Sequence, residues 1–370
     1  MYIHQLTDWP HFHWNNEALA KPLAEVRHAQ GLLLGHMGAL GFNLQQEAVL
    51  KTLTTDVLKS SEIEGEKLDA EQVRSSIARR LGMDVGGLKS VDRNVEGVVE
   101  MMLDATRHYD QTLTEDRLFG WHASLFPAGR SGMRKISVGA WRGDSDGPMQ
   151  VVSGPIGKEH VHFEAPAALR VEKEMNGFLD WFNADTGIDL VMKAGLAHLW
   201  FVTVHPFEDG NGRIARAIAD MTLARSEKSP QRFYSMSAQI RLERNAYYEI
   251  LERTQRAGMD VTPWMEWFLA CLGRAIEGAQ TALSAVLAKA KFWERVRQTT
   301  VNERQRLVLN KVMDGFDGKL TTAKYAKLTK SSHDTALRDI VQLVEKGLLV
   351  RSSEGGRSTS YAVAGFPGNE

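Results

Sequence analysis

The sequence has very little of what secreted and membrane proteins need. Among its 370 residues only Cys271 is a cysteine, so neither an internal disulfide nor a Cys-rich zinc site can form. It also lacks any run of about 18 apolar residues, which disfavours a transmembrane helix. The first 14 residues carry His and Trp where a secretory signal has basic and apolar stretches. We therefore expect a cytoplasmic protein, with Cys271 as an inert core residue.

The sequence also lacks an excess of charge of either sign. Lys and Arg number 45 and Asp and Glu number 46, so the net charge is −1. Such a chain is not a bulk polyelectrolyte, and any phosphate that it binds must be held by a local site. Hydrophobic residues make up 43%, which is enough for a core and excludes a largely disordered chain. The length predicts two or three domains.

Apolar residues recur at helical spacing through most of the chain, which predicts a mainly α-helical fold. The segments with this spacing are residues 47–61, 69–82, 94–108, 114–125, 168–182, 189–204, 213–226, 241–256 and 263–288. Residues 189–204 are so uniformly apolar that we expect a buried central helix. A stretch rich in Gly and Pro interrupts the helices at 127–166. Within it, residues 149–152 and 160–163 are expected to form a β-hairpin with a long tip.

Residues 301–370 are expected to form a separate winged helix-turn-helix, because three helical patterns precede two β-like segments around residues 355–356. The segment holds 11 Lys and Arg against 8 Asp and Glu, a mild excess. Its third helix carries Arg338 near its start, where DNA would be read, but also Asp334 and Asp339, which oppose phosphate. DNA binding and a protein-docking or homodimer role therefore both stay open.

The segment HPFEDGNGRIAR, from His205 to Arg216, has the parts of a phosphate-binding site. Gly210 and Gly212 let the backbone turn tightly and approach a ligand closely. The N–H groups at the start of the following helix have no helical partner, and the helix dipole there favours an anion. The pattern therefore predicts an anion site at this loop.

The other side chains of this segment add charge and a base. Arg213 and Arg216 share one helix face, where a bound anion relieves their repulsion. Asn211 adds a neutral donor, Asp209 offers a carboxylate to a hard cation such as Mg²⁺, and His205 can act as a general base. The competing interpretation is a structural loop in which Asp209 pairs with Arg213.

This segment resembles the Fic family motif, His-x-Phe-x-Asp/Glu-Gly-Asn-Gly-Arg-x-x-Arg, at every defined position. The segment 139–142, the hairpin and the apolar helix segment 189–204 resemble further parts of a Fic domain. The resemblance implies a Fic/Doc-like helical catalytic domain at 94–290, with an N-terminal helical region at 1–93 and the winged helix at 300–370.

What the resemblance implies is transfer of AMP from ATP to a Tyr, Thr or Ser hydroxyl of a protein substrate, the chain itself included. His205 would deprotonate the hydroxyl, and Asp209 would hold Mg²⁺ on the phosphates. The phosphates would be cradled by Gly210, Asn211, Gly212, Arg213 and Arg216. Phe207 would be a buried anchor of the loop. The alternative function is a nucleotide-sensing, DNA-binding transcriptional regulator.

The hairpin is similar to the flap of the family, which holds the target by pairing with its backbone. The flap residues expected to dock the target are Met149, Gln150, Val151, Val152, His160, Val161 and His162.

A built-in inhibitor is the last expectation. Ser60-x-x-x-Glu64-Gly65 resembles the inhibitory motif of the family in the class that carries it before the catalytic domain. Ser60 and Glu64 share one helix face, and Gly65 is a plausible helix stop. In the family this Glu pairs with the last Arg of the motif, here Arg216, and keeps it from the γ-phosphate of ATP. In some relatives the same Glu supports removal of AMP, so the resemblance leaves a reversible enzyme open. The competing interpretation of Glu64 is a solvent-exposed acid at a helix end.

Overall fold

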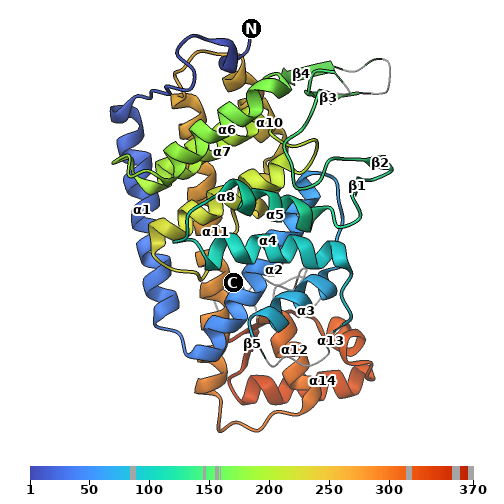
Figure 1. Cartoon of the computed structure of the whole chain (residues 1–370). Coiled ribbons are helices and arrows are strands. Elements are labelled where there is room, and N and C mark those ends of the chain that lie inside the picture. The colour runs from blue at the N-terminus through green and yellow to red at the C-terminus, as the bar shows by residue number, and fades with distance from the viewer. Residues whose placement is uncertain are drawn as a thin grey trace. The chain divides into compact units, whose positions relative to one another are not determined.

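The computed structural model describes residues 1–83, 89–144, 147–154, 158, 160–313, 319–351 and 359–365. The chain divides into two compact units, Met1–Ala279 and Gln280–Glu370. Both units are mainly helical, with short strands only among the described residues, so the predicted fold class is confirmed (Figure 1).

Two helices form the centre of the first unit. α7 (Leu190–Val204) begins at Asp189, whose carboxylate accepts a hydrogen bond from the Val191 N–H at 2.8 Å. Every residue of α7 from Val191 to Val204 is buried, which confirms the expected central helix. α8 (Asn211–Glu227) packs along α7. The loop between these helices therefore has both of its ends fixed in the core.

The remaining helices of the first unit surround this pair. After the N-terminal region, they are α4 (Arg93–Arg107), α5 (Glu115–Leu125), α6 (Ala168–Asn183), α9 (Met236–Leu242), α10 (Arg244–Gln255) and the part of α11 (Thr262–Arg295) up to Ala279. The helix predicted at 241–256 is present as α10, but it begins later than predicted, because α9 and α10 are separated at Glu243. The Glu243 carboxylate is held by the Arg274 guanidinium of α11 at 2.5 and 2.6 Å, a long-range contact that the apolar spacing does not record.

The N-terminal region consists of a 3-10 turn at Ile3–Gln5 and three helices, α1 (Asn16–Gly38), α2 (Phe42–Ile63) and α3 (Ala70–Arg80). α2 starts earlier than the apolar spacing predicted, and it ends before Gly65, whose φ is +86°. It packs against α3, α4, α8 and α9. This packing brings the residues after its C-terminal end to the beginning of α8.

Aromatic side chains near the start of the chain pack into the same unit. The rings of Trp9 and Phe12 lie edge-on to each other, and both contact the Trp200 ring of α7 with centroids about 6 Å apart. These aromatics therefore serve packing.

The predicted hairpin is present and projects from the first unit beside α10 (Figure 1). β3 (Gln150–Ser153) pairs antiparallel with β4 (His160–Glu164), with Gln150 opposite Glu164 and an irregularity between Val151 and Val152. Most of the expected tip, residues 155–157 and 159, lies outside the described residues. A shorter pair that the sequence did not reveal, β1 (Arg130–Ser131) and β2 (Arg134–Lys135), precedes it.

The second unit has the element order that the sequence predicted. α12 (Glu303–Met313), α13 (Thr322–Thr329) and α14 (His333–Glu345) precede the antiparallel strands β5 (Leu349–Arg351) and β6 (Tyr361–Val363). Residues 355–356, the expected turn, lie outside the described residues. Asp339 is buried and accepts hydrogen bonds from Asn302, Arg304 and Tyr325. The expectation that Asp339 opposes phosphate from the surface is therefore wrong.

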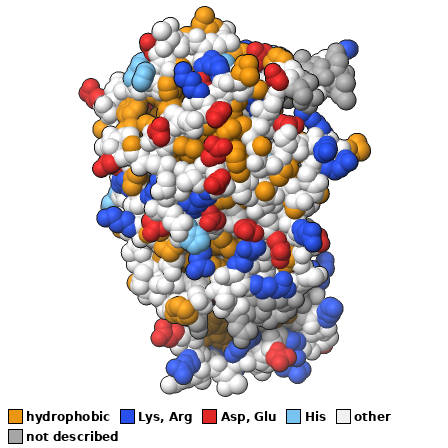
Figure 2. Space-filling model, in the orientation of Figure 1, with side chains coloured by type: hydrophobic (Ala, Val, Ile, Leu, Met, Phe, Trp, Pro, Cys, Tyr) orange, Lys and Arg blue, Asp and Glu red, His pale blue; other side chains and the backbone are white. Residues whose placement is uncertain are grey.

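The surface carries both signs of charge. Acidic and basic side chains are interspersed over the face drawn in Figure 2, in keeping with the balanced composition. Among the described helices, none combines the length and apolarity that a membrane span requires.

Gly97 sets the close approach of α4 and α5. A Cβ added there would clash with the backbone carbonyl of Ser124, whereas a Cβ added at Gly177 on the exposed face of α6 meets open space. We expect Gly97→Ala to lower the free energy of unfolding by about 2 kcal/mol or more, because backbone cannot yield as a side chain can. Gly177→Ala, the matched control, should leave stability unchanged or raise it by up to about 1 kcal/mol. Urea unfolding measures both, and equal stability of the two variants would contradict the tight crossing.

Candidate functional site

Arg142 fixes the backbone of the loop between α7 and α8. The Arg142 Nε donates to the His205 carbonyl at 2.7 Å, and its backbone N–H donates to the Pro206 carbonyl at 2.9 Å. The Arg142 side chain is buried, so these bonds form in a low-dielectric surrounding where they are strong. Arg142 is the last residue of the segment 139–142, which the sequence analysis related to a Fic domain. Its role is to position the loop.

Asn211 and Phe207 close the loop from within. The Phe207 N–H donates to Asn211 Oδ1 at 2.9 Å, and Asn211 Nδ2 donates to the Phe207 carbonyl at 2.8 Å. Phe207 is fully buried and stacks on the His122 ring with centroids 4.2 Å apart, as expected of an anchor. The Asn211 side chain is directed at the loop and not at a ligand, which corrects the expectation of a free donor. The backbone N–H of Asn211 remains at the start of α8.

His205 stands at the C-terminal end of α7 in a left-handed conformation with φ of 52°. Its Nδ1 lies 3.3 Å from the Val202 carbonyl, which can only accept, so Nδ1 carries the proton and Nε2 is left as an acceptor. Burial lowers the pKa of His205 to about 4. The side chain is therefore neutral at physiological pH, as a general base must be.

Asp209 supplies the carboxylate of the loop. One of its oxygens accepts a hydrogen bond from the Ser131 hydroxyl of β1. The neighbouring Glu208 is turned away, since it accepts from the Ser137 N–H at 3.1 Å and from Arg134 at 3.3 Å. A single part-buried carboxylate, oriented by a hydroxyl, is the kind of hard oxygen donor that Mg²⁺ takes from a protein.

Arg216 connects the site to the end of α2. Its Nη1 lies 2.8 Å from a Glu64 carboxylate oxygen, its Nε donates to the Ser60 hydroxyl at 3.0 Å, and its Nη2 donates to the Ser60 carbonyl at 2.8 Å. The Arg216 side chain is only 2% exposed. Burial opposes its charge, but the Glu64 carboxylate outweighs this and raises the pKa of Arg216. The structure thus brings Ser60, Glu64 and Arg216 together, and Glu64 is not a free surface acid.

The Glu64 carboxylate also lies over the first turn of α8. A Cβ added at Gly212 would clash with a Glu64 carboxylate oxygen. The missing side chain at Gly212 therefore lets an anion approach the helix start closely. Gly210 instead allows the backbone to turn, with φ of +82°. A carboxylate occupies the position that the helix start prepares for an anion.

Arg213 has a second acidic partner that sequence reasoning missed. Its Nη1 lies 2.7 Å from a Glu66 carboxylate oxygen, and its guanidinium covers the Phe126 ring at 5.0 Å. The structural-loop interpretation paired Arg213 with Asp209, and this pairing does not occur. Glu66 follows the helix stop at Gly65, so no periodicity or cap pattern could have marked it.

The hairpin residues belong to other elements than the motif loop. Met149 precedes β3, Gln150, Val151 and Val152 belong to β3, and His160, Val161 and His162 belong to β4. The described side-chain bonds of His162 go to Ser153 and to Glu252 of α10. β3 pairs with β4 alone among the described strands, so its other edge is free for an added strand.

Parts of this chain are similar in sequence to known proteins. Residues 112–223 match the Fic/DOC family, and residues 2–83 match a domain of unknown function, DUF4172. The protein adenylyltransferase Fic of Nematostella vectensis is 34% identical over 142 residues, which are 36% of this chain and 30% of that protein. The protein adenylyltransferase fic-1 of Caenorhabditis elegans is 39% identical over 62 residues, 16% of this chain and 12% of that protein. The chain thus spans less than a third of the length of these curated relatives.

Solved structures share the fold over a longer part. A Fic family protein from Desulfovibrio desulfuricans G20 covers 95% of this chain and 98% of its own, with a TM-score of 0.52 and 21% identity. A Fic domain containing signaling protein from Bacteroides thetaiotaomicron VPI-5482 covers 72% of this chain and 97% of its own, with a TM-score of 0.51 and 21% identity. At this identity the likeness concerns the fold alone.

The Asn211 clamp on Phe207 has a counterpart far from the loop, because Asn183 binds both backbone groups of Leu113 in the same way at 2.8 and 3.0 Å. We expect Asn211→Ala to cost about 2 kcal/mol or more of unfolding free energy, since it leaves two buried backbone groups unpaired. Asn183→Ala, at an exposed residue, should cost about 1 kcal/mol or less. Urea unfolding measures both costs, and an equal cost would contradict the role of Asn211 in closing the loop.

Proposed function

We propose that this chain, in which residues 112–223 are a Fic/DOC domain, transfers AMP from ATP to a Tyr, Thr or Ser hydroxyl of a protein. The observation that carries the proposal is the grouping, on one loop, of a neutral His205, an oriented Asp209 and the start of α8 with Arg213 and Arg216. The names of the partial relatives, both protein adenylyltransferases, support the same reaction.

The reaction uses each of these groups once. The target hydroxyl loses its proton to His205 Nε2 as its oxygen bonds to the α-phosphorus of ATP. The bond from that phosphorus to the bridging oxygen breaks, and pyrophosphate leaves. Asp209 would hold Mg²⁺, which supplies charge neutralisation for the phosphates when bound. The N–H groups at the start of α8, with Arg213 and Arg216, stabilise the negative charge that remains.

We further propose that the enzyme is held inactive by Glu64. As long as Glu64 binds Arg216 and covers Gly212, the last Arg of the motif cannot bind the γ-phosphate. Glu66 pairs with Arg213 and keeps that guanidinium from the phosphates in the same way. Both carboxylates follow α2, so one movement of residues 60–66 would free both guanidiniums together. Such a movement would expose the whole anion site to ATP.

The alternative, a nucleotide-sensing DNA-binding regulator, depends on the second unit. There α14 exposes Leu337, Val341 and Val344, which are spaced to lie on one helix face. An apolar face on the helix that would read DNA favours protein docking over a base-reading role. We therefore propose the winged helix, at about residues 300–370, as a docking module of the transferase.

The test is incubation of the full chain with labelled ATP, Mg²⁺ and cell lysate. We expect Glu64→Gly to raise covalent label on protein at least tenfold over wild type, because it frees Arg216. Adding His205→Ala to that variant should abolish the label, because the target hydroxyl then has no base. Tight ATP binding without covalent label in Glu64→Gly would contradict the transferase and support the regulator.

Glu62 provides the matched control for the inhibitor. It lies on the same helix end but pairs with Lys59 at 2.8 Å and not with the motif. Glu62→Gly should therefore keep the low activity of wild type. Equal labelling by wild type and a folded Glu64→Gly, or equal activation by Glu62→Gly, would contradict inhibition by Glu64.

His205 also sets the expected pH dependence. Its pKa is lowered to about 4 by burial, so the base form is present above that pH and is lost as the pH falls through it. The kcat/KM of Glu64→Gly should stay level from about pH 8 to about pH 5 and decline only below. Circular dichroism at each pH separates this decline from unfolding. A midpoint near the ordinary histidine pKa of about 6.5 would contradict a buried, neutral base.

A further inference from the structure

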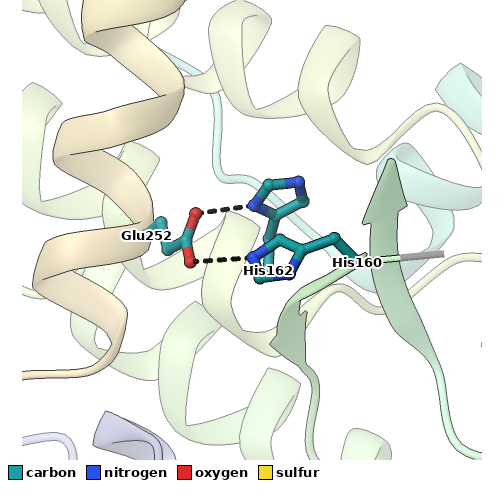
Figure 3. A group of neighbouring side chains, drawn as sticks. All are labelled: His160, His162 and Glu252. Atoms are coloured by element: carbon teal, nitrogen blue, oxygen red, sulfur yellow. Dashed lines mark hydrogen bonds and ion pairs between the residues drawn. The ribbon is translucent and has the colours of Figure 1, made fainter. Parts of the chain in front are cut away.

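Two histidines and a glutamate meet where the hairpin rests on α10. His160 and His162 alternate along β4, so both side chains leave the same face of the strand, toward Glu252 (Figure 3). One donor atom from each of the three residues lies within 4.8 Å of the others. None of the three residues belongs to the loop between α7 and α8.

The three side chains already face a common point. His162 Nδ1 lies 2.6 Å from one Glu252 oxygen, and His160 Nε2 lies 4.0 Å from the other (Figure 3). Around a tetrahedral ion at about 2.0–2.2 Å, neighbouring ligand atoms stand about 3.4 Å apart. On binding an ion, the contact between His162 and Glu252 must therefore lengthen from 2.6 Å, and the distance between His160 and Glu252 must shorten from 4.0 Å. The His160 side chain is 66% exposed and can make this movement.

The surroundings of His162 and Glu252 also suit a metal. The Ser153 hydroxyl lies 2.6 Å from His162 Nε2, the nitrogen on the other side of the ring. When Nδ1 binds a metal, the ring proton lies on Nε2. The Ser153 hydroxyl can then accept a hydrogen bond from this N–H, as outer partners of metal-bound histidines do. Arg256 lies 3.3 Å from Glu252 and is the competing cation, but it is also anchored on the carbonyls of Val161 and His162.

We propose that His160, His162 and Glu252 bind a divalent transition metal, with Zn²⁺ as the best fit. Two imidazoles and one carboxylate suit Zn²⁺ or Ni²⁺ and do not suit Mg²⁺, which prefers oxygen ligands alone. Three protein ligands leave a fourth position for water. The bound ion would join β4 of the hairpin to α10. It would thereby fix β3 as well, which pairs with β4 and has its other edge free among the described strands.

The test is titration of the metal-stripped full chain with Zn²⁺ in excess Mg²⁺, by calorimetry and by competition with a chromogenic chelator. Wild type should bind one Zn²⁺ that His160→Ala and His162→Ala each weaken at least tenfold. Co²⁺ should give the visible spectrum of a tetrahedral site in wild type only. Circular dichroism shows whether each variant is folded.

Two controls separate this site from others on the chain. His108→Ala removes a histidine that pairs with Asp104 at 2.8 Å and that belongs to no group of three possible metal ligands among the described residues, so it should leave Zn²⁺ binding unchanged. Asp209→Asn should abolish the proposed transfer but not Zn²⁺ binding, so the two proposals can fail separately. Equal Zn²⁺ affinity of wild type and folded His160→Ala and His162→Ala, or no binding by wild type, would overturn the metal site.

Discussion

The ion pair between Arg216 and Glu64 is the contact on which the state of this molecule depends. The Arg216 guanidinium is 2% exposed, and burial disfavours a charge without a partner, so an anion beside it stabilises the buried charge. Two kinds of anion can meet this need at the same place: a carboxylate of the chain or a phosphate of a ligand. The start of α8, with its unpaired N–H groups and Gly212, accepts either one. Competition between them follows from electrostatics alone and needs no change of the catalytic loop.

That loop is independent of the competition because other contacts hold it. Arg142 binds its carbonyls from one side, and Asn211 closes it around the buried Phe207 from the other. His205 is already neutral and Asp209 already oriented while Glu64 is in place. In the proposed inhibition, the inactive arrangement therefore differs from a competent one by the position of residues 60–66 and not by the geometry of His205. Catalytic groups that are organised in advance need only the substrate to enter.

Much of this arrangement could be predicted because the parts are local in sequence. The motif residues share one loop and one helix start. The spacing of four residues between Ser60 and Glu64 predicts that both lie on one helix face. Contacts between distant segments could not be predicted in the same way. The Glu66 pairing with Arg213 and the break at Glu243 each depend on a partner far along the chain. The donor role expected of Asn211 failed for a related reason, since an amide at a helix start can face inward or outward with the same spacing.

The charge balance of the chain gains a physical meaning from these pairs. A site that concentrates Arg213 and Arg216 at a positive helix end would repel itself and attract any anion if it stood open. Glu64 and Glu66 follow the same helix, and each carboxylate pairs with one of the two guanidiniums and offsets its charge. Because both acids belong to one short segment, loss of one contact weakens the hold of the other. The acids that pair with the two guanidiniums are thus also the groups that a nucleotide must displace under the proposed mechanism, so stability and the proposed inhibition have the same cause.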